Sequence, residues 1–165
     1  MVYVRRSGFN ELFRAYVRHV TAICQVKCGA KQNRATVMPI TVLLADDSDL
    51  VRRAIRRLLM DHPEINLVGE ATDFAQTIRM IQELQPQIVI LDLHMSDSKR
   101  ITPGEFRSRL NLGKARLMAI SVWNDPETQA LAGSYGAANC LDKASLGTHL
   151  IPAILHLASP SSEFN

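Results

Sequence analysis

The centre of the chain reads Gln87-Ile88-Val89-Ile90-Leu91-Asp92-Leu93-His94-Met95. Residues 88–91 are apolar and rich in β-branched side chains, and Pro86 precedes them, which predicts a strand buried on both faces. The run ends in Asp92, a carboxylate that is costly to bury unless it is solvated, paired or bound to a metal. Ligands of open parallel α/β sheets bind at the carboxyl ends of strands. Asp92 is therefore either a functional group or a helix cap.

Strand and helix patterns alternate on both sides of this stretch. Five βα repeats with short connections predict an α/β fold with a five-stranded parallel sheet and helices on both faces. The strands are expected at 40–45, 65–70, 88–92, 115–122 and 139–142. The helix N-caps are expected at Ser48 or Asp49, Asp73, Thr102, Asp125 and Ser145.

Three helices carry further expectations. Arg52, Arg53, Arg56 and Arg57 follow the first strand at helical spacing and predict a solvated face. The helix after Asp125 is expected to turn Ala130, Leu131 and Tyr135 inward. Pro152 lies within the last helical pattern, where it predicts a bend or a late helix start.

Charge is unevenly distributed along the 165 residues. Residues 1–39 hold seven Lys/Arg and one acid, net +6, whereas residues 40–165 hold twelve Lys/Arg and fifteen acids, net −3. The excess of basic residues thus belongs to the N-terminal segment, and no direct nucleic-acid binding is expected of the globular part. Three cysteines without a secretory signal indicate reduced thiols and a cytoplasmic protein. No run of 18 apolar residues occurs, so no transmembrane segment is expected.

The N-terminal segment has its own pattern. Within residues 1–38, apolar side chains from Phe9 to Cys24 recur at helical spacing, with Arg14 and Arg18 off that stripe, which predicts a basic amphipathic helix. It is either a membrane-surface anchor, a partner-binding helix, a helix packed on the domain, or an extension outside the functional unit. The domain proper is expected over 39–158, followed by a polar tail at 159–165.

Polar residues stand at the ends of four predicted strands. Asp46 and Asp47 follow the first strand, Asp92 ends the third, Ser121 the fourth, and Lys143 follows the fifth. In a parallel sheet these groups meet at one edge, where three carboxylates repel each other unless a cation joins them. Oxygen-only ligands suit Mg²⁺. Mg²⁺, Lys143 and the Ser121 hydroxyl together suit a phosphoryl group, and Asp92 is placed to attack phosphorus and form an acyl phosphate.

These residues resemble a known family. Residues 40–158 look like a two-component response-regulator receiver domain, nearest to receivers that precede a helix-turn-helix output domain. The resemblance rests on Val42-Leu43-Leu44-Ala45-Asp46-Asp47-Ser48, Ile88 to Met95, Ile120-Ser121, Gly136-Ala137-Ala138 and Lys143-Ala144-Ser145. It implies a flavodoxin-like (βα)5 three-layer sandwich with strand order 2-1-3-4-5.

The resemblance also implies roles for individual residues. Asp92 is expected to be the phosphoacceptor, with Asp46, Asp47, Asp92 and the backbone carbonyl of His94 as Mg²⁺ ligands. Ser121 is expected to be the switch hydroxyl and Lys143 the phosphate partner.

The chain departs from the family pattern at three places. Ser96 stands where the family usually has Pro, and the loop 97–102 is longer than usual. Cys140 stands where an aromatic switch residue is expected, so coupling between Ser121 and that aromatic is not expected in its usual form. Trp123, two residues after Ser121, is expected to shield the phosphoryl group from water and slow its hydrolysis.

These observations favour a stand-alone receiver over an enzyme that turns over a separate substrate. A sensor histidine kinase or phosphotransfer protein is the expected donor, and a downstream protein is expected to bind the 126–157 face, with a phosphorylation-linked dimer as a further assembly. The alternative is a degenerate receiver that binds partners without phosphorylation. A phosphatase that uses Asp92 as its nucleophile is disfavoured, because such enzymes commonly carry a second acid two residues after the nucleophile and this chain has His94 there. A nucleotide-binding domain is disfavoured because no glycine-rich loop follows the first strand.

Overall fold

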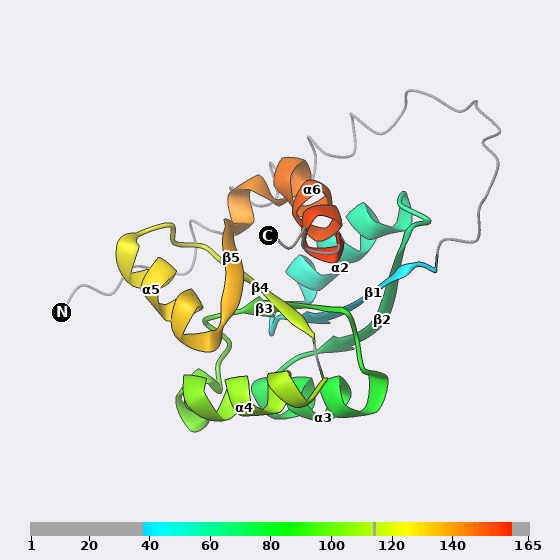
Figure 1. Ribbon diagram of the computed structural model, residues 1–165. Coiled ribbons are helices and arrows are strands. Elements are labelled where there is room, and N and C mark those ends of the chain that lie inside the picture. The colour runs from blue at the N-terminus through cyan, green and yellow to red at the C-terminus, as the bar shows by residue number, and fades with distance from the viewer. Residues whose placement is uncertain (1–37, 114, 160–165) are drawn as a thin grey trace, which may run out of the picture. The chain divides into compact units, whose positions relative to one another are not determined.

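The computed structural model describes residues 38–113 and 115–159 (Figure 1). The predictions for the amphipathic helix of residues 1–37 and for the tail at 160–165 lie outside the described residues. The described residues form one compact unit. None of the helices within 38–113 and 115–159 is long and apolar enough to cross a bilayer.

The centre of this unit is a five-stranded parallel sheet with strand order β2-β1-β3-β4-β5. The predicted sheet, its parallel pairing and its strand order are thereby confirmed. Every residue of β3 is buried, as the apolar run predicted. The strands are β1 (Ile40–Ala45), β2 (Ile65–Ala71), β3 (Ile88–Asp92), β4 (Arg116–Ser121) and β5 (Ala137–Asp142).

Helices cover both faces of the sheet (Figure 1). The first and last of the described helices contact each other on one face, while the three helices between them pack in sequence on the other. The helices are α2 (Asp49–Met60), α3 (Phe74–Leu84), α4 (Pro103–Gly113), α5 (Pro126–Tyr135) and α6 (Leu146–Ala158), with short 3₁₀ turns at Ser98–Arg100 and Lys143–Ser145. This is the predicted three-layer sandwich.

Local chemistry sets several helix starts. The Asp73 carboxylate accepts a hydrogen bond from the amide of Gln76, and Asp125 accepts one from Thr128, so both residues cap their helices as predicted. At α4 the Thr102 hydroxyl accepts from the Glu105 amide, and the Glu105 carboxylate accepts from the Thr102 amide, which forms a capping box.

Other expectations were met only in part. Ser48 and Ser145 stand at the N-cap positions of α2 and α6, as predicted, but neither side chain accepts a hydrogen bond from its helix. The helix α5 buries Ala132 and leaves Ala130 exposed, contrary to the prediction for Ala130. The two alanines lie two residues apart and have the same side chain, so the sequence does not show which of them faces the core. Pro152 lies inside α6, which excludes the late helix start, while the bend at this position stays a prediction.

An aromatic cluster holds α3, α4 and α5 together beneath the sheet. Phe74 packs edge-on against Phe106 and stacks on Tyr135, each with ring centroids 5.6 Å apart. All three side chains are buried. Aromatic pairs of this geometry contribute about 0.5–1.5 kcal/mol beyond their burial. The cluster therefore stabilises the packing of α3, α4 and α5 against one another.

Candidate functional site at the carboxyl edge of the sheet

The parallel register brings the predicted polar residues to one edge. Ala45 pairs with Leu91, Asp92 pairs with Ile120, and Ser121 pairs with Asp142. The ends of β1, β3, β4 and β5 therefore lie side by side. This confirms that the residues directly after these strands share one edge of the sheet.

A buried lysine joins two of the carboxylates. Lys143 Nζ lies 2.7 Å from Asp46 Oδ2 and 2.8 Å from Asp92 Oδ2. Asp46 is fully buried, and Asp92 and Lys143 are each 4% exposed. Within the described part of the chain, the enclosed Asp46 Oδ2 contacts the ammonium and accepts no further hydrogen bond. One buried ammonium thus faces two carboxylates, and the net negative charge that remains suits a second cation.

The electrostatics follow from that arrangement. Burial raises the pKa of Asp46 from 3.8 to about 6, and the neighbouring Asp92 carboxylate adds to the rise, while Lys143 and the Ser48 amide oppose it. Burial disfavours the charged form of Lys143, but the Asp92 and Asp46 carboxylates outweigh it and raise the pKa of the ammonium above its ordinary value. Lys143 is therefore a fixed positive charge at neutral pH.

Asp47 completes a three-carboxylate group. Asp46, Asp47 and Asp92 each offer an oxygen, and these oxygens lie within 4.8 Å of one another. Asp47 is exposed, and its Oδ2 accepts a hydrogen bond of 3.0 Å from the Ser96 amide in the loop after β3. An oxygen-only donor set with one solvated member fits Mg²⁺, which keeps several of its waters when bound to proteins.

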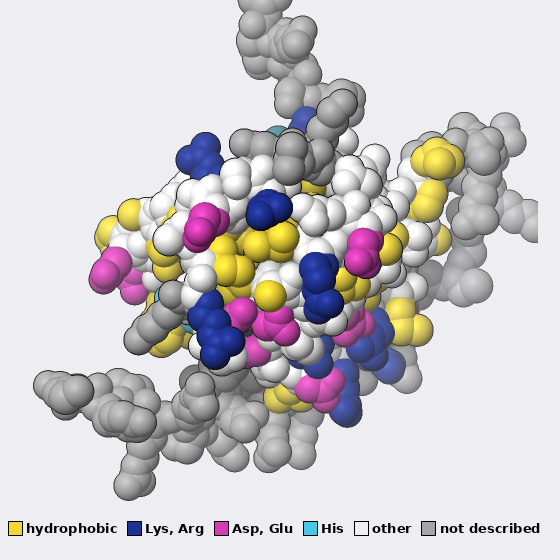
Figure 2. All heavy atoms as spheres, turned by 90° about the horizontal axis from the view of Figure 1, so that it is seen from below, with side chains coloured by type: hydrophobic (Ala, Val, Ile, Leu, Met, Phe, Trp, Pro, Cys, Tyr) yellow, Lys and Arg dark blue, Asp and Glu magenta, His cyan; other side chains and the backbone are white. Residues whose placement is uncertain are grey.

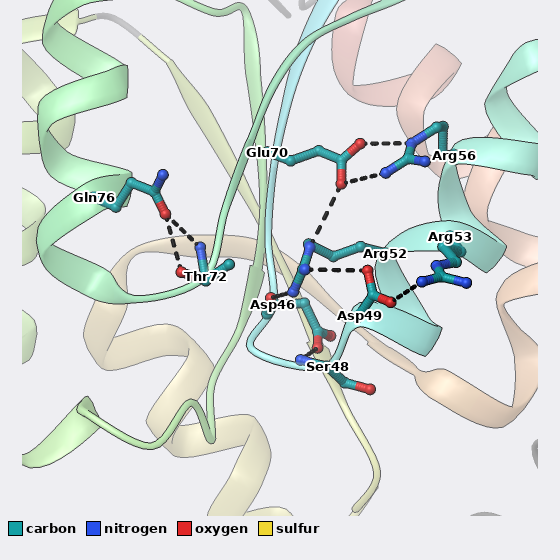
Figure 3. Close-up of polar contacts among 9 residues, drawn as sticks. All are labelled: Asp46, Ser48, Asp49, Arg52, Arg53, Arg56, Glu70, Thr72 and Gln76. Carbon is teal, nitrogen blue, oxygen red and sulfur yellow. Dashed lines mark hydrogen bonds and ion pairs between the residues drawn. The ribbon is translucent and has the colours of Figure 1, made fainter.

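The sequence did not predict the role of an arginine that contacts the backbone of Asp46. Arg52 was predicted to lie on a solvated face, yet its side chain is only 13% exposed. Its Nη1 donates a 2.8 Å hydrogen bond to the backbone carbonyl of Asp46, and its guanidinium also lies 3.5 Å from the Glu70 carboxylate of β2 (Figure 3). Arg56 donates two hydrogen bonds to the same carboxylate, of 2.7 and 2.8 Å. Arg52 thus links the backbone of Asp46 to α2 and β2.

The loop after β3 is fixed by the acids themselves. The His94 amide donates a 3.1 Å hydrogen bond to Asp92 Oδ1, so this carboxylate supports its own loop and caps no helix. Asp97, 23 residues along the chain, accepts from the Phe74 amide at the start of α3 with both oxygens, at 3.0 and 3.2 Å. No local pattern pointed to the Asp97 contact.

The Ser121 hydroxyl and the Trp123 ring close the edge beside β4. Ser121 is buried, and its Oγ accepts a 3.1 Å hydrogen bond from the Trp123 amide. The Trp123 ring is 53% exposed and packs edge-on against the His94 ring, with centroids 4.5 Å apart. The two rings line a cavity of about 310 Å³ that continues along α5 past Asp125 and Leu131.

Cys140 occupies the middle of β5. It pairs with Ala119 and is half-buried against the apolar core on the face of the sheet that α3, α4 and α5 cover. Burial raises the pKa of its thiol, with the Asp142 carboxylate adding to the effect. It therefore lies in the sheet as a neutral thiol.

The family and its relatives agree with this geometry. Residues 42–155 match the family model described as the response regulator receiver domain. The nitrate/nitrite response regulator protein NarL of Escherichia coli K12 is 33% identical over 122 residues, which cover 73% of this chain and 55% of NarL. The transcriptional regulatory protein LiaR of Bacillus subtilis is 29% identical over 115 residues, which cover 70% of this chain and 54% of LiaR. The chain thus spans about half the length of the curated relatives it matches.

A solved structure gives the same answer in three dimensions. The signal receiver domain of the putative response regulator NarL from Mycobacterium tuberculosis superposes with a TM-score of 0.64 at 28% identity, over 72% of this chain and 94% of that domain. The family match covers more than half of the chain. The chain belongs to the response-regulator receiver family.

Proposed function

We propose that Asp92 accepts a phosphoryl group in a Mg²⁺-dependent reaction and that the chain signals through this modification. The observation that carries the proposal is the contact of Lys143 Nζ with Asp92 Oδ2 and Asp46 Oδ2 at the edge of the sheet. A carboxylate oxygen of Asp92 attacks phosphorus and forms a P–O bond while the donor's P–N or P–O bond breaks. The leaving group departs with the bonding electrons and takes up a proton.

The neighbouring side chains divide the work. Lys143 supplies a fixed positive charge for the phosphoryl oxygens, and the Ser121 hydroxyl donates a hydrogen bond to one of them. Asp46, Asp47 and Asp92, with the His94 carbonyl, would hold Mg²⁺. When bound, Mg²⁺ neutralises negative charge on the transferring group. The chain's own contribution is to position the Asp92 oxygen and to exclude water on the Trp123 side.

The phosphoryl donor and the output are proteins in this proposal. A sensor histidine kinase or phosphotransfer protein supplies the phosphoryl group, in the cytoplasm, and a downstream partner or relay protein reads a surface within 126–157. Phosphorylation biases two arrangements of that surface. Moving a 1:99 population to 99:1 takes about 5.5 kcal/mol of differential stabilisation. A partner that binds wild type and Asp92→Asn equally, with and without an acyl phosphate donor, would contradict this output.

Residues 39–158 are proposed as the phosphorylated unit, with 1–38 as an extension and 159–165 as a tail. The match of residues 42–155 to the family supports these bounds. No separate substrate is turned over, so the only chemistry is self-phosphorylation and self-dephosphorylation.

A degenerate receiver is the second candidate. Cys140 on β5 favours it, because the position lacks the aromatic side chain that the family resemblance leads one to expect. Such a protein would bind partners without modification. Mg²⁺ binding and phosphoryl incorporation separate the two: the proposed receiver shows both in the wild type and loses incorporation in Asp92→Asn, whereas a degenerate receiver incorporates no phosphoryl group.

A further inference from the structure

A second concave surface lies between α3 and α4, outside the acid edge. It encloses about 460 Å³, within the range of roughly 300–1,000 Å³ typical of ligand pockets. These two helices lie at the bottom of Figure 1, and Figure 2 looks onto this side of the molecule, where hydrophobic and charged side chains alternate. The α3/α4 groove is lined by Ala75, Ile78, Arg79, Arg100, Ile101, Glu105, Ser108 and Arg109.

The floor of the α3/α4 groove is apolar. Ile78 and Ile101 pack against the core on one side and remain partly exposed on the other, and Ala75 is exposed beside them. The capping of α3 by Asp97 and the capping box at the start of α4 fix both walls. A groove built this way is formed before a ligand arrives, which lowers the entropic cost of binding.

The rim of the groove is cationic. Arg79, Arg100 and Arg109 are exposed, and within residues 38–113 and 115–159 none of them forms a salt bridge or a hydrogen bond through its guanidinium. Glu105 is the one acid among the lining residues, and its carboxylate accepts hydrogen bonds from Thr102. Three guanidiniums around an apolar floor form a surface complementary to carboxylates that flank an apolar stripe.

We infer that the α3/α4 groove binds an acidic amphipathic segment of a partner protein. The segment lays an apolar stripe on Ile78 and Ile101 and pairs its carboxylates with the arginines on the rim. This is the helix-in-groove mode of peptide recognition, with apolar anchors at helical spacing. The site is separate from the 126–157 surface and does not depend on phosphorylation of Asp92.

Charge and chemistry on the page argue against other occupants. The chain's own N-terminal segment carries a net charge of +6 over residues 1–39, so the arginines repel it. A nucleic acid would match the positive charge, but among the described residues that line the groove none is aromatic and able to stack on a base, and the floor is apolar.

The test uses the full chain and a designed probe. The probe is a fluorescent peptide of about 16 residues, long enough to form a helix, with Leu at helical spacing and Glu on the remaining face. A twin peptide carries Lys at each Glu. Binding is measured by fluorescence anisotropy, and the contact surface is mapped from amide chemical shifts of the ¹⁵N-labelled chain.

Variants locate the contact. Arg79→Glu, Arg100→Glu and Arg109→Glu each reverse one rim charge, and Ala75→Tyr fills the floor without changing charge. Arg57→Glu is the matched control, because Arg57 is an exposed arginine on α2, outside the groove. Circular dichroism verifies that each variant is folded.

The expected result is binding of the Glu peptide with shift changes confined to α3, α4 and the loop 96–102. Each rim reversal should weaken binding about fivefold or more, Ala75→Tyr should weaken it, and Arg57→Glu should leave it unchanged. The inference is overturned by equal binding of the Lys twin, by no binding of the Glu peptide to the folded chain, or by equal binding to all rim variants. It is also overturned if a single-stranded oligonucleotide, or a second copy of the chain in sedimentation, occupies this surface in place of the peptide.

Discussion

The Lys143 ammonium lies 2.8 Å from the Asp92 carboxylate, with both groups almost completely buried. The same ammonium lies 2.7 Å from Asp46, so one positive charge faces two acids. Removing one partner of a buried ion pair leaves an uncompensated charge and costs roughly 3–5 kcal/mol. The folded state therefore depends on Lys143 to keep these two acids buried.

Lys143→Met should lower the free energy of unfolding by about 3 kcal/mol at pH 8. Urea denaturation without divalent cations measures this loss. Added Mg²⁺ should restore part of it, because the metal supplies positive charge to the same carboxylates. Lys143→Arg, which keeps a cation at this position, is the control and should lose less. Equal stability of Lys143→Met and wild type would contradict the role of the buried pair.

Asp46 should give the metal-free protein an acid-dependent stability. Its folded-state pKa, about 6, exceeds its ordinary 3.8, so the native state binds more protons than the unfolded chain between these values. The stabilisation from this group is complete below about pH 4 and is lost as the pH rises through about 6. The difference in unfolding free energy between wild type and Asp46→Asn should therefore change across that window.

The matched control for this titration is Asp47→Asn, which leaves the Asp46 carboxyl in place. It should follow the wild-type pH dependence through the same window. A pH-independent difference between wild type and Asp46→Asn would show that burial does not raise the pKa of Asp46.

Arg52→Gln should weaken Mg²⁺ binding roughly tenfold, as is typical when a group that orients metal ligands is removed. Arg52 donates to the Asp46 carbonyl and so fixes the backbone that carries the acid pair. The chain's single tryptophan, Trp123, contacts His94 beside the site, so its fluorescence reports the titration. Arg53→Gln is the control, because Arg53 is exposed and pairs only with the exposed Asp49 carboxylate among the described residues. Indistinguishable affinities of the two variants would refute a positioning role for Arg52.

Trp123→Ala should speed hydrolysis of the acyl phosphate several-fold. The Trp123 ring packs against His94, two residues after Asp92, and from this position we expect it to restrict the access of water to the phosphoryl group. Loss of phosphoryl mass over time measures the rate. Trp123→Phe retains an aromatic ring and should remain near wild type. An unchanged rate in Trp123→Ala would refute the shielding role.

The parts of the fold that the sequence predicted depend on local chemistry. The apolar run before Asp92 predicted a fully buried strand. Asp73 and Asp125 predicted helix caps, and each carboxylate accepts a hydrogen bond from the amide three residues further along the chain. Short connections in a βα alternation then require the strand ends to meet at one edge. For this reason the convergence of Asp46, Asp92 and Lys143 was predictable before any coordinates.

The missed contacts join residues from different elements. The helical pattern placed Arg52 on the polar side of α2, but its partners are a backbone carbonyl after β1 and a glutamate on β2. Asp97 similarly caps α3 from a loop 23 residues away. Such partners depend on the packing of α2 and α3 against the sheet, which periodicity and capping patterns do not specify.

The central claim is that Asp92 accepts the phosphoryl group. The most direct measurement is the intact mass of the chain after incubation with Mg²⁺ and acetyl phosphate or phosphoramidate, with Asp92→Asn in parallel. We expect a gain of one phosphoryl group in the wild type, none in Asp92→Asn, and none when Mg²⁺ is chelated. An unmodified but folded wild type with several donors, or equal modification of Asp92→Asn, would contradict it.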